Sequence, residues 1–211
     1  NSTYDIGILD HTPMGGFNRE TVTRNNLAGT MSGKFWLDYP VPGIFDHNWI
    51  GDVRSVLCDP DNLDFRPAEG AEIIDSGIAS DRLEMIVWGD SPDIGAYEAG
   101  ATHYWIPGRQ TSKASTPIPP DHAAKVKPTA DLMWLGAYRA SSHEVYFGED
   151  RDRIENATRD SDLFRGSYLT NIFVPGNLES GKTYYWRVDA VKDQGTIRGD
   201  TWRFTVEEIT K

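Results

Sequence analysis

The sequence predicts an all-β protein made of two parts joined by a short linker. Apolar and polar residues alternate in several short runs of the second half, which is typical of half-buried strands. That half has no sustained helical period, and the apolar runs of the first half are too short for a doubly wound sheet with helices. Residues 110–120 are rich in Ser, Thr and Pro, which favours a linker between the two parts.

The two parts differ in charge. Residues 1–108 carry 6 Lys and Arg against 17 Asp and Glu, whereas residues 109–211 carry 15 of each, so the net charge of −11 falls on the first part. This balance argues against nucleic acid as a partner. No apolar run reaches about 18 residues, so no membrane span is predicted. The single cysteine, Cys58, cannot form an internal disulfide and is interpreted as a buried apolar residue.

Residues 122–211 predict a β-sandwich. Several short strands separated by Gly, Asn and Asp turns are typical of that architecture. The strongest alternating runs are residues 130–137, 142–149, 183–191 and 200–208. Residues 151–160 are polar and predict a single exposed helical turn or a loop.

This half resembles a fibronectin type III domain. The resemblance rests on Trp134 in an early strand, on Leu178 six residues before Tyr184, and on the run "YYWRV". It implies a tyrosine corner, in which the Tyr184 hydroxyl bonds to nearby backbone. The segments "GKTYYWRVDAV" and "GDTWRFTV" resemble the form of this domain attached to bacterial secreted polysaccharide-degrading enzymes.

The first half predicts a solenoid. It consists of short apolar runs separated by corners rich in Asn, Asp and Gly, of which residues 22–33 and 45–52 are the clearest. Strand and turn units that repeat in this way are typical of stacked coils.

Two segments of the first half resemble the C-terminal end of right-handed parallel β-helix proteins. They are "DPDNLDFRPAEGAEIIDSG" at residues 59–77 and "SPDIGAYEAG" at residues 91–100, although Glu72 stands where proline is usual. The resemblance implies that residues 1–108 are the terminal coils and cap of such a β-helix, followed by a linker over residues 109–121. A solenoid needs a terminal repeat to cover its apolar end. We expect an N-terminal β-helix portion of the same protein to precede these coils.

The two resemblances together imply the C-terminal region of a secreted or cell-surface bacterial enzyme that degrades polysaccharides. A lyase is favoured over a hydrolase, and the catalytic residues are expected on coils upstream of this chain. The segment itself would cap the solenoid and act as a spacer or glycan-binding module, with polysaccharide as its partner. The alternative is a non-catalytic carbohydrate-binding or cell-surface adhesion protein.

The candidate catalytic residues are two histidines, His11 and His47. Each follows an aspartate, and a general base of a lyase is often a histidine near a carboxylate. Neighbouring residues of a strand point to opposite faces, so adjacency in sequence does not by itself make either histidine a pair with its aspartate. Corner or core positions are the other interpretation of both.

Aromatic side chains are the candidates for sugar binding, because sugars stack their apolar faces on aromatic rings. The candidates are Tyr138, Tyr185, Trp36 and Trp49, with core or edge positions as the alternative for the tryptophans. Tyr104 and Trp105 are interpreted as anchors of the linker to the solenoid.

Calcium is the only cofactor that the sequence suggests. Asp59, Asp61 and Asp64 are closely spaced carboxylates, and carboxylate oxygens are ligands of Ca²⁺. The alternative is a turn in which these side chains cap backbone N–H groups.

Overall fold

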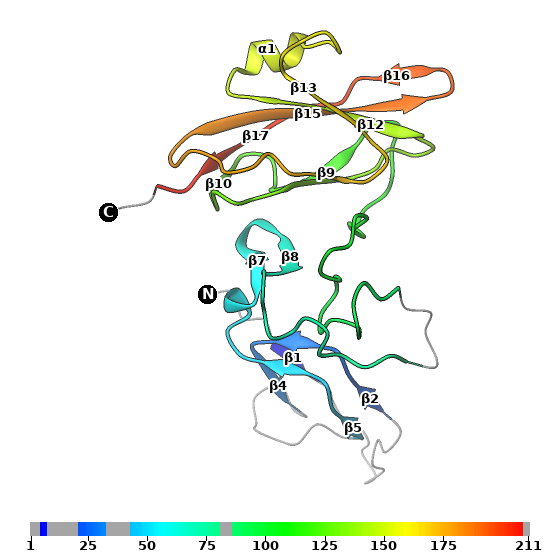
Figure 1. The fold of residues 1–211 in the computed structure, drawn as a ribbon, viewed down its shortest axis with the longest axis vertical. Coiled ribbons are helices and arrows are strands. Elements are labelled where there is room, and N and C mark those ends of the chain that lie inside the picture. Colours follow the sequence, from blue (N-terminus) through cyan, green and yellow to red (C-terminus); the bar gives the residue numbers. More distant parts are fainter. Residues whose placement is uncertain (1–4, 8–20, 33–42, 81–85, 209–211) are drawn as a thin grey trace. The chain divides into compact units, whose positions relative to one another are not determined.

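The structure is a computed structural model that describes residues 5–7, 21–32, 43–80 and 86–208. The chain divides into two compact units, one of residues 1–60 and 65–101 and one of residues 61–64 and 102–211 (Figure 1). Strands dominate both units. No helix in the described part of the chain is long and apolar enough to cross a membrane.

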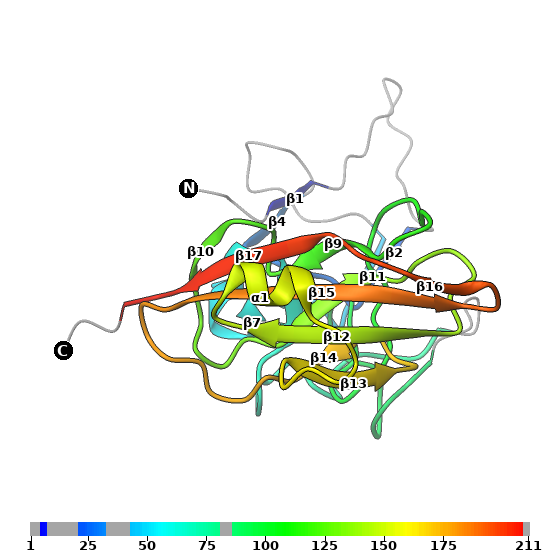
Figure 2. The same cartoon turned by 90° about the horizontal axis from the view of Figure 1, so that it is seen from above.

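Two sheets form the sandwich of the second unit. The first has the strand order β14-β11-β9 and the second β10-β17-β15-β12-β13, with β16 paired to β15. All pairs are antiparallel except β10 with β17. Figure 2 shows β17, β15 and β12 side by side in one layer. The strands are β9 (Ser115–Ile118), β10 (Ala123–Val126), β11 (Leu132–Leu135), β12 (Ser142–Gly148), β13 (Phe164–Tyr168), β14 (Ile172–Phe173), β15 (Thr183–Lys192), β16 (Gly195–Ile197) and β17 (Thr201–Val206).

The four strands predicted in this half are confirmed as β11, β12, β15 and β17. Their alternating residues form the core, in which Trp134 and Trp186 are fully buried. The Trp186 ring meets Trp202 edge to face at a centroid distance of 4.8 Å. Burial of large aromatic rings removes much apolar area from water and stabilises the sandwich.

The tyrosine corner is present. The Tyr184 hydroxyl accepts a hydrogen bond from the Glu179 backbone N–H at 3.0 Å, and Leu178 beside it is buried. This contact ties the segment before β15 to the start of that strand. The corner and the sheet order confirm a fibronectin type III-like β-sandwich.

The predicted linker is wrong over part of its length. Within residues 109–121, Ser115–Ile118 form β9, which pairs with β11, and Ala114 and Ile118 belong to the core. Proline cannot donate a ladder hydrogen bond, but an edge strand tolerates it, and β9 is the edge of its sheet. The Pro-rich composition therefore marks an edge strand and not only a linker.

One short helix, α1 (Arg151–Asn156), covers the outer face of the second sheet (Figure 1). It occupies the segment where a helical turn or a loop is predicted. Ile154 packs with Tyr146, Ala157 and Leu163 in a small apolar cluster. The fully buried Arg187 lies beneath the helix and donates to the carbonyl oxygens of Ile154, Glu155 and Ala157. A cation at the last carbonyls of a helix stabilises its C-terminus.

The first unit contains three short parallel strand pairs. Its strands are β1 (Asp5–Gly7), β2 (Val22–Thr23), β3 (Leu27–Ala28), β4 (Thr30–Ser32), β5 (Ile44–Phe45), β6 (Trp49–Ile50) and β7 (Leu57–Asp59), with a 3₁₀ turn at Val53–Ser55. The 3₁₀ turn Pro60–Asn62 and the strand β8 (Asp64–Pro67) each include residues that are assigned to the second unit. β1 pairs with β4, β2 with β5 and β3 with β6. These pairs are two or three residues long, so the described residues do not by themselves constitute a β-helix.

A small core fills this unit. Val53, Val56, Leu57, Ile73 and Ile94 are buried together. The backbone N–H of Ile94 donates to the Ile73 carbonyl at 2.9 Å, which joins the segment "SPDIGAYEAG" to the segment "EIIDSG". The two segments that carry the resemblance therefore pack against each other.

Candidate functional site

The candidate site is a groove on the sandwich with a volume of about 970 Å³. Residues 103–110, the β11–β12 connection and residues 169–171 form its walls. Two of its aromatic side chains face solvent: Trp105 is 74% exposed and Tyr138 is 52% exposed. Exposed rings in a groove of this size are suited to stack on the apolar face of a small organic ligand.

One wall of the groove is held by the buried amide of Asn171. Its Oδ1 accepts from the Tyr104 N–H at 2.8 Å, and its Nδ2 donates to the carbonyl oxygens of Tyr104 and Trp134 at 2.8 and 3.1 Å. Tyr104 and Ile106 are buried on either side of the exposed Trp105. Buried and exposed side chains alternate over residues 104–106, so Trp105 projects to solvent from a backbone that its buried neighbours hold in place.

His143 holds the opposite wall. The side chain is buried, its Nε2 accepts from the Ala137 N–H at 3.0 Å, and its ring meets Trp134 edge to face. Burial lowers the pKa of His143 to about 4, with smaller contributions from the positive charges of His103 and Lys192. The imidazole is therefore neutral at pH 7 and serves as an acceptor that positions the β11–β12 connection.

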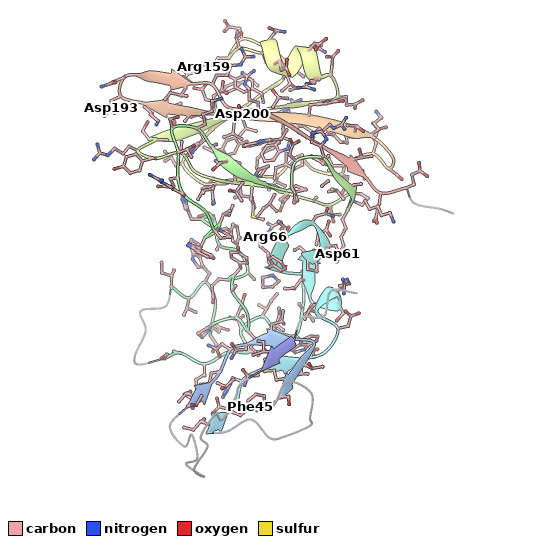
Figure 3. The ribbon with its side chains drawn as sticks, turned by 180° about the vertical axis from the view of Figure 1, so that it is seen from behind. Phe45, Asp61, Arg66, Arg159, Asp193 and Asp200 are labelled. Atoms are coloured by element: carbon pink, nitrogen blue, oxygen red, sulfur yellow. The ribbon has the colours of Figure 1, made fainter. Side chains whose placement is uncertain are left out.

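The described lining of the groove contains basic but no acidic side chains. None of its described residues is Asp or Glu, whereas His103 and Arg109 belong to it. The Arg139 guanidinium lies 5.1 Å from the ring centroid of Tyr138, a cation–π distance. A smaller neighbouring hollow of about 410 Å³ is lined by Arg139, Lys192 and the β15–β16 turn with Asp193 (Figure 3).

The structure brings only one of the predicted aromatic candidates into this groove. Tyr138 lines it, whereas Tyr185 is half-buried beside the apolar cluster under α1. Trp49 lies in the first unit, where its Nε1 donates to Glu72 Oε1 at 2.6 Å. Trp36 lies outside the described residues.

Sequence reasoning missed Trp105 as a groove residue, because the prediction treats Tyr104 and Trp105 together as anchors. Tyr104 does anchor its segment, through Asn171 of the sandwich. The alternation in "YWI" is the signal that separates the two, since it buries Tyr104 and Ile106 and exposes Trp105.

His47 lies beside its neighbouring aspartate, a pairing that the sequence leaves open. Its Nδ1 lies 3.3 Å from Asp46 Oδ1. His47 has a φ of 47° and turns a corner, so the alternation of faces along a strand does not apply to it. Arg24 donates to both oxygens of Asp46 at 2.6 and 3.0 Å, and this contact holds the pKa of Asp46 below its usual value. His11 lies outside the described residues.

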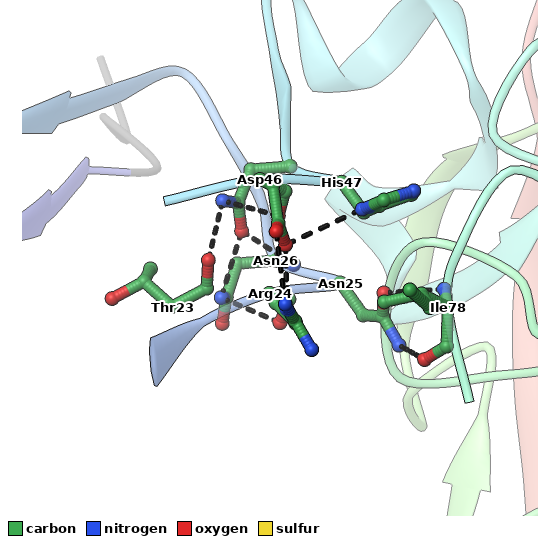
Figure 4. Close-up of polar contacts among 8 residues, drawn as sticks. Thr23, Arg24, Asn25, Asn26, Asp46, His47 and Ile78 are labelled. Carbon is green, nitrogen blue, oxygen red and sulfur yellow. Dashed lines mark hydrogen bonds and ion pairs between the residues drawn. The ribbon is translucent and has the colours of Figure 1, made fainter. Parts of the chain in front are cut away.

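The same corner contains a ladder of two asparagines, Asn26 and Asn48, 22 residues apart (Figure 4). Asn26 donates its Nδ2 and its backbone N–H to Asn48 Oδ1 at 2.9 and 3.1 Å. Asn48 Nδ2 donates to the carbonyls of Thr23 and Asp46 at 2.8 and 2.9 Å. These amides add hydrogen bonds to backbone groups of the corner, where the Thr23 carbonyl also accepts from the Asp46 N–H at 3.3 Å.

Three carboxylates of the resemblance segments bind backbone N–H groups. Asp75 Oδ1 accepts from Asp90 and Ser91 at 2.8 and 3.1 Å, and Asp93 Oδ1 accepts from Asp75 at 2.8 Å. Glu98 Oε1 in turn accepts from the Asp93 N–H at 3.1 Å. The acids of "IDSG" and "DIGAYE" are therefore structural, since they replace backbone acceptors in an irregular segment.

The predicted calcium ligands occupy a turn. Asp59 ends β7 and is buried, Asp61 lies in the exposed 3₁₀ turn, and Asp64 begins β8 and is buried. Among the residues that the structure describes, no group of three or more His, Cys, Asp or Glu side chains is placed to hold a metal ion.

Comparisons with known proteins concern the sandwich. No family model and no curated protein matches the chain. A crystal structure of an Fn3-like protein from Clostridium thermocellum matches 49% of this chain and 100% of its own at 14% identity, with a TM-score of 0.34. The fibronectin type III domain of human fibronectin type III domain containing protein 3 matches 49% of this chain and 93% of its own at 14% identity, with a TM-score of 0.32. The class of this unit, a fibronectin type III-like sandwich, is defined by its sheet order and tyrosine corner.

Proposed function

We propose that the chain is an accessory region of a secreted bacterial protein that acts on polysaccharides, and that the groove of the sandwich binds a glycan. The observation that carries the proposal is the pair of exposed rings, Trp105 and Tyr138, in a groove of about 970 Å³. Sugars combine apolar C–H faces with polar rims, which suits aromatic rings beside polar groups.

The walls of the groove support this function because they are held in place. Asn171 and His143 each bind backbone of the segments that carry the two rings. A preformed site loses less conformational entropy when it binds a ligand than a flexible one does. The groove also offers Gln110 and Arg109 as hydrogen-bond donors.

For the first unit we propose the terminal coils of a parallel β-helix. The Asn26–Asn48 ladder and the Asn25 to His47 backbone bond, both 22 residues apart, support a repeat of that length. Asn25 and His47, at φ values of 56° and 47°, turn the same kind of corner in both turns of the chain. The carboxylates of the closing segment would then finish the solenoid.

The enzymatic context of the proposal rests on the resemblances of the sequence. A polysaccharide lyase is favoured over a hydrolase, with its catalytic residues on coils outside this sequence. The alternative, a non-catalytic adhesion protein, uses the same groove and differs in what it is attached to.

Glycan binding is tested by native affinity electrophoresis of the whole chain against neutral and acidic polysaccharides. We expect at least one polysaccharide to retard the chain, and the double variant Trp105→Ala, Tyr138→Ala to lose about tenfold or more in affinity, because aromatic contacts dominate such sites. Trp88→Ala is the matched control, because Trp88 is 51% exposed and lies in the other unit. A double variant that binds as well as the parent would exclude the groove as the glycan-binding site. If no polysaccharide retards the chain, glycan binding is excluded and a role as a spacer remains.

A further inference from the structure

We propose that the groove selects sugars that carry a negative charge, a carboxylate or a sulfate, with Arg109 as the group that binds the anion. The inference rests on the proposed function and deepens it. Trp105 and Tyr138 would stack on the sugar ring while the guanidinium binds its acidic substituent. A planar guanidinium can donate two parallel hydrogen bonds to a carboxylate or a sulfate.

The first support is the pairing of the cations. In the sandwich, Lys113, Arg153, Lys182 and Arg187 each bind a carboxylate within 3.1 Å. Arg165 and Arg203 instead bind a carbonyl and an imidazole. Arg109 is exposed in the groove lining and forms no ion pair with any described residue, so its guanidinium is available to a ligand there.

The surroundings of Arg109 add to this positive charge. Arg139 and Lys192 line the adjoining hollow and likewise form no ion pair with a described residue. The acid of that hollow, Asp193, lies in the β15–β16 turn and is not among the groove residues. Three cations without carboxylate partners among the described residues, in a chain whose net charge is −11, form a local field that attracts anions.

The second support is the set of donors that remain for a ligand. The amide of Asn171 is fully engaged by backbone. Ser141 donates to the Val191 carbonyl and Ser142 bonds to Ser167. The remaining polar side chains of the described lining include Arg109, Gln110, His103 and Thr170, and among these four only Arg109 carries a permanent positive charge and acts solely as a donor.

The electrostatics of His143 agree with this geometry. Burial first, and then the neighbouring His103 and Lys192, lower the pKa of His143. A bound anion would find no carboxylate of the described lining to repel it.

The test is calorimetric titration of the whole chain with pairs of ligands that differ only in charge. Oligogalacturonate is compared with its methyl ester, and chondroitin sulfate oligosaccharide with its desulfated form. We expect the charged member of at least one pair to bind about tenfold tighter or more, since hydrogen bonds to charged groups are the strong ones. The two pairs separate a carboxylate preference from a sulfate preference.

The variant Arg109→Gln tests whether Arg109 is the group that binds the anion. We expect it to remove about tenfold of the affinity for the charged ligand and to lower that for the neutral one much less, with the melting transition of the parent retained. Arg198→Gln, an exposed arginine outside the groove, is the control. Equal binding of charged and neutral members would overturn the inference and leave glycan binding intact. Failure of every ligand, neutral or charged, would overturn both proposals.

Discussion

At the scale of single residues, two buried polar side chains shape the groove without facing a ligand. Asn171 makes three hydrogen bonds to backbone, and His143 makes one to the Ala137 N–H. Each side chain bonds to backbone groups in the way that a neighbouring strand would in a sheet. Because a buried polar group without a partner is costly, these residues should contribute more to stability than exposed residues of the same type.

Asn171→Ala tests this at the groove wall. The substitution removes three hydrogen bonds to backbone in a buried site, so we expect it to lower the free energy of unfolding by about 2 kcal/mol or more. Urea unfolding followed by tryptophan fluorescence measures the change. Asn177→Ala, in an exposed turn, should stay within about 0.5 kcal/mol of the parent. An equally small effect for Asn171→Ala would show that water replaces the amide.

His143 predicts a pH dependence of stability. Its pKa of about 4 in the folded state lies below the 6.5 of an unperturbed histidine, so the unfolded chain binds the proton more readily between these values. The contribution is complete above pH 6.5 and is lost as the pH falls toward 4, on the order of 2 kcal/mol after allowance for partial solvation.

Urea unfolding of the parent and of His143→Gln at pH 7 and pH 4.5 measures this term. His103 and Lys192, the two cations that act on His143, are unchanged in the variant, and the carboxylates titrate alike in both proteins. The parent should lose more stability than the variant on acidification. Parallel losses in the two proteins would contradict a histidine held neutral.

At the scale of elements, the corner of the first unit depends on paired amides. Asn26 and Asn48 bond to each other and to three backbone carbonyls, at a place where the chain leaves one short strand for the next. β2 and β5 are two residues long, so their own ladder bonds cannot hold this turn. The amides therefore act as part of the secondary structure.

Asn48→Ala should open this corner. We expect a loss of about 1–2 kcal/mol, because Asn48 donates to two carbonyls and accepts from Asn26. Native-state hydrogen exchange of residues 22–28 and 44–50 measures it locally. The double variant with Asn26→Ala should lose less than the sum of the single losses, since the two side chains share bonds. Glu69→Ala, in an exposed turn, is the control, and additive losses would contradict a ladder.

At the scale of the whole molecule, charge and chemistry are divided between the two units. The acidic excess falls on residues 1–108, where Asp75, Asp93 and Glu98 are engaged by backbone N–H groups. The second unit is balanced in sequence, yet its cations are distributed unevenly among ion pairs. The net charge of the second unit therefore does not reveal the cations at the groove, because it counts ion-paired and unpaired charged groups together.

The sequence by itself determined the sandwich and its tyrosine corner, because alternation of apolar residues and the Leu178–Tyr184 spacing are local signals that burial preserves. It also named Tyr138, which lines the groove, among the candidates for sugar binding. The strand β9 within the predicted linker, the corner at His47 and the bound amide of Asn171 were decided only by the tertiary structure. Each depends on a partner far along the chain, such as Asn171 with Tyr104 at a separation of 67 residues, and no local pattern encodes such a partner.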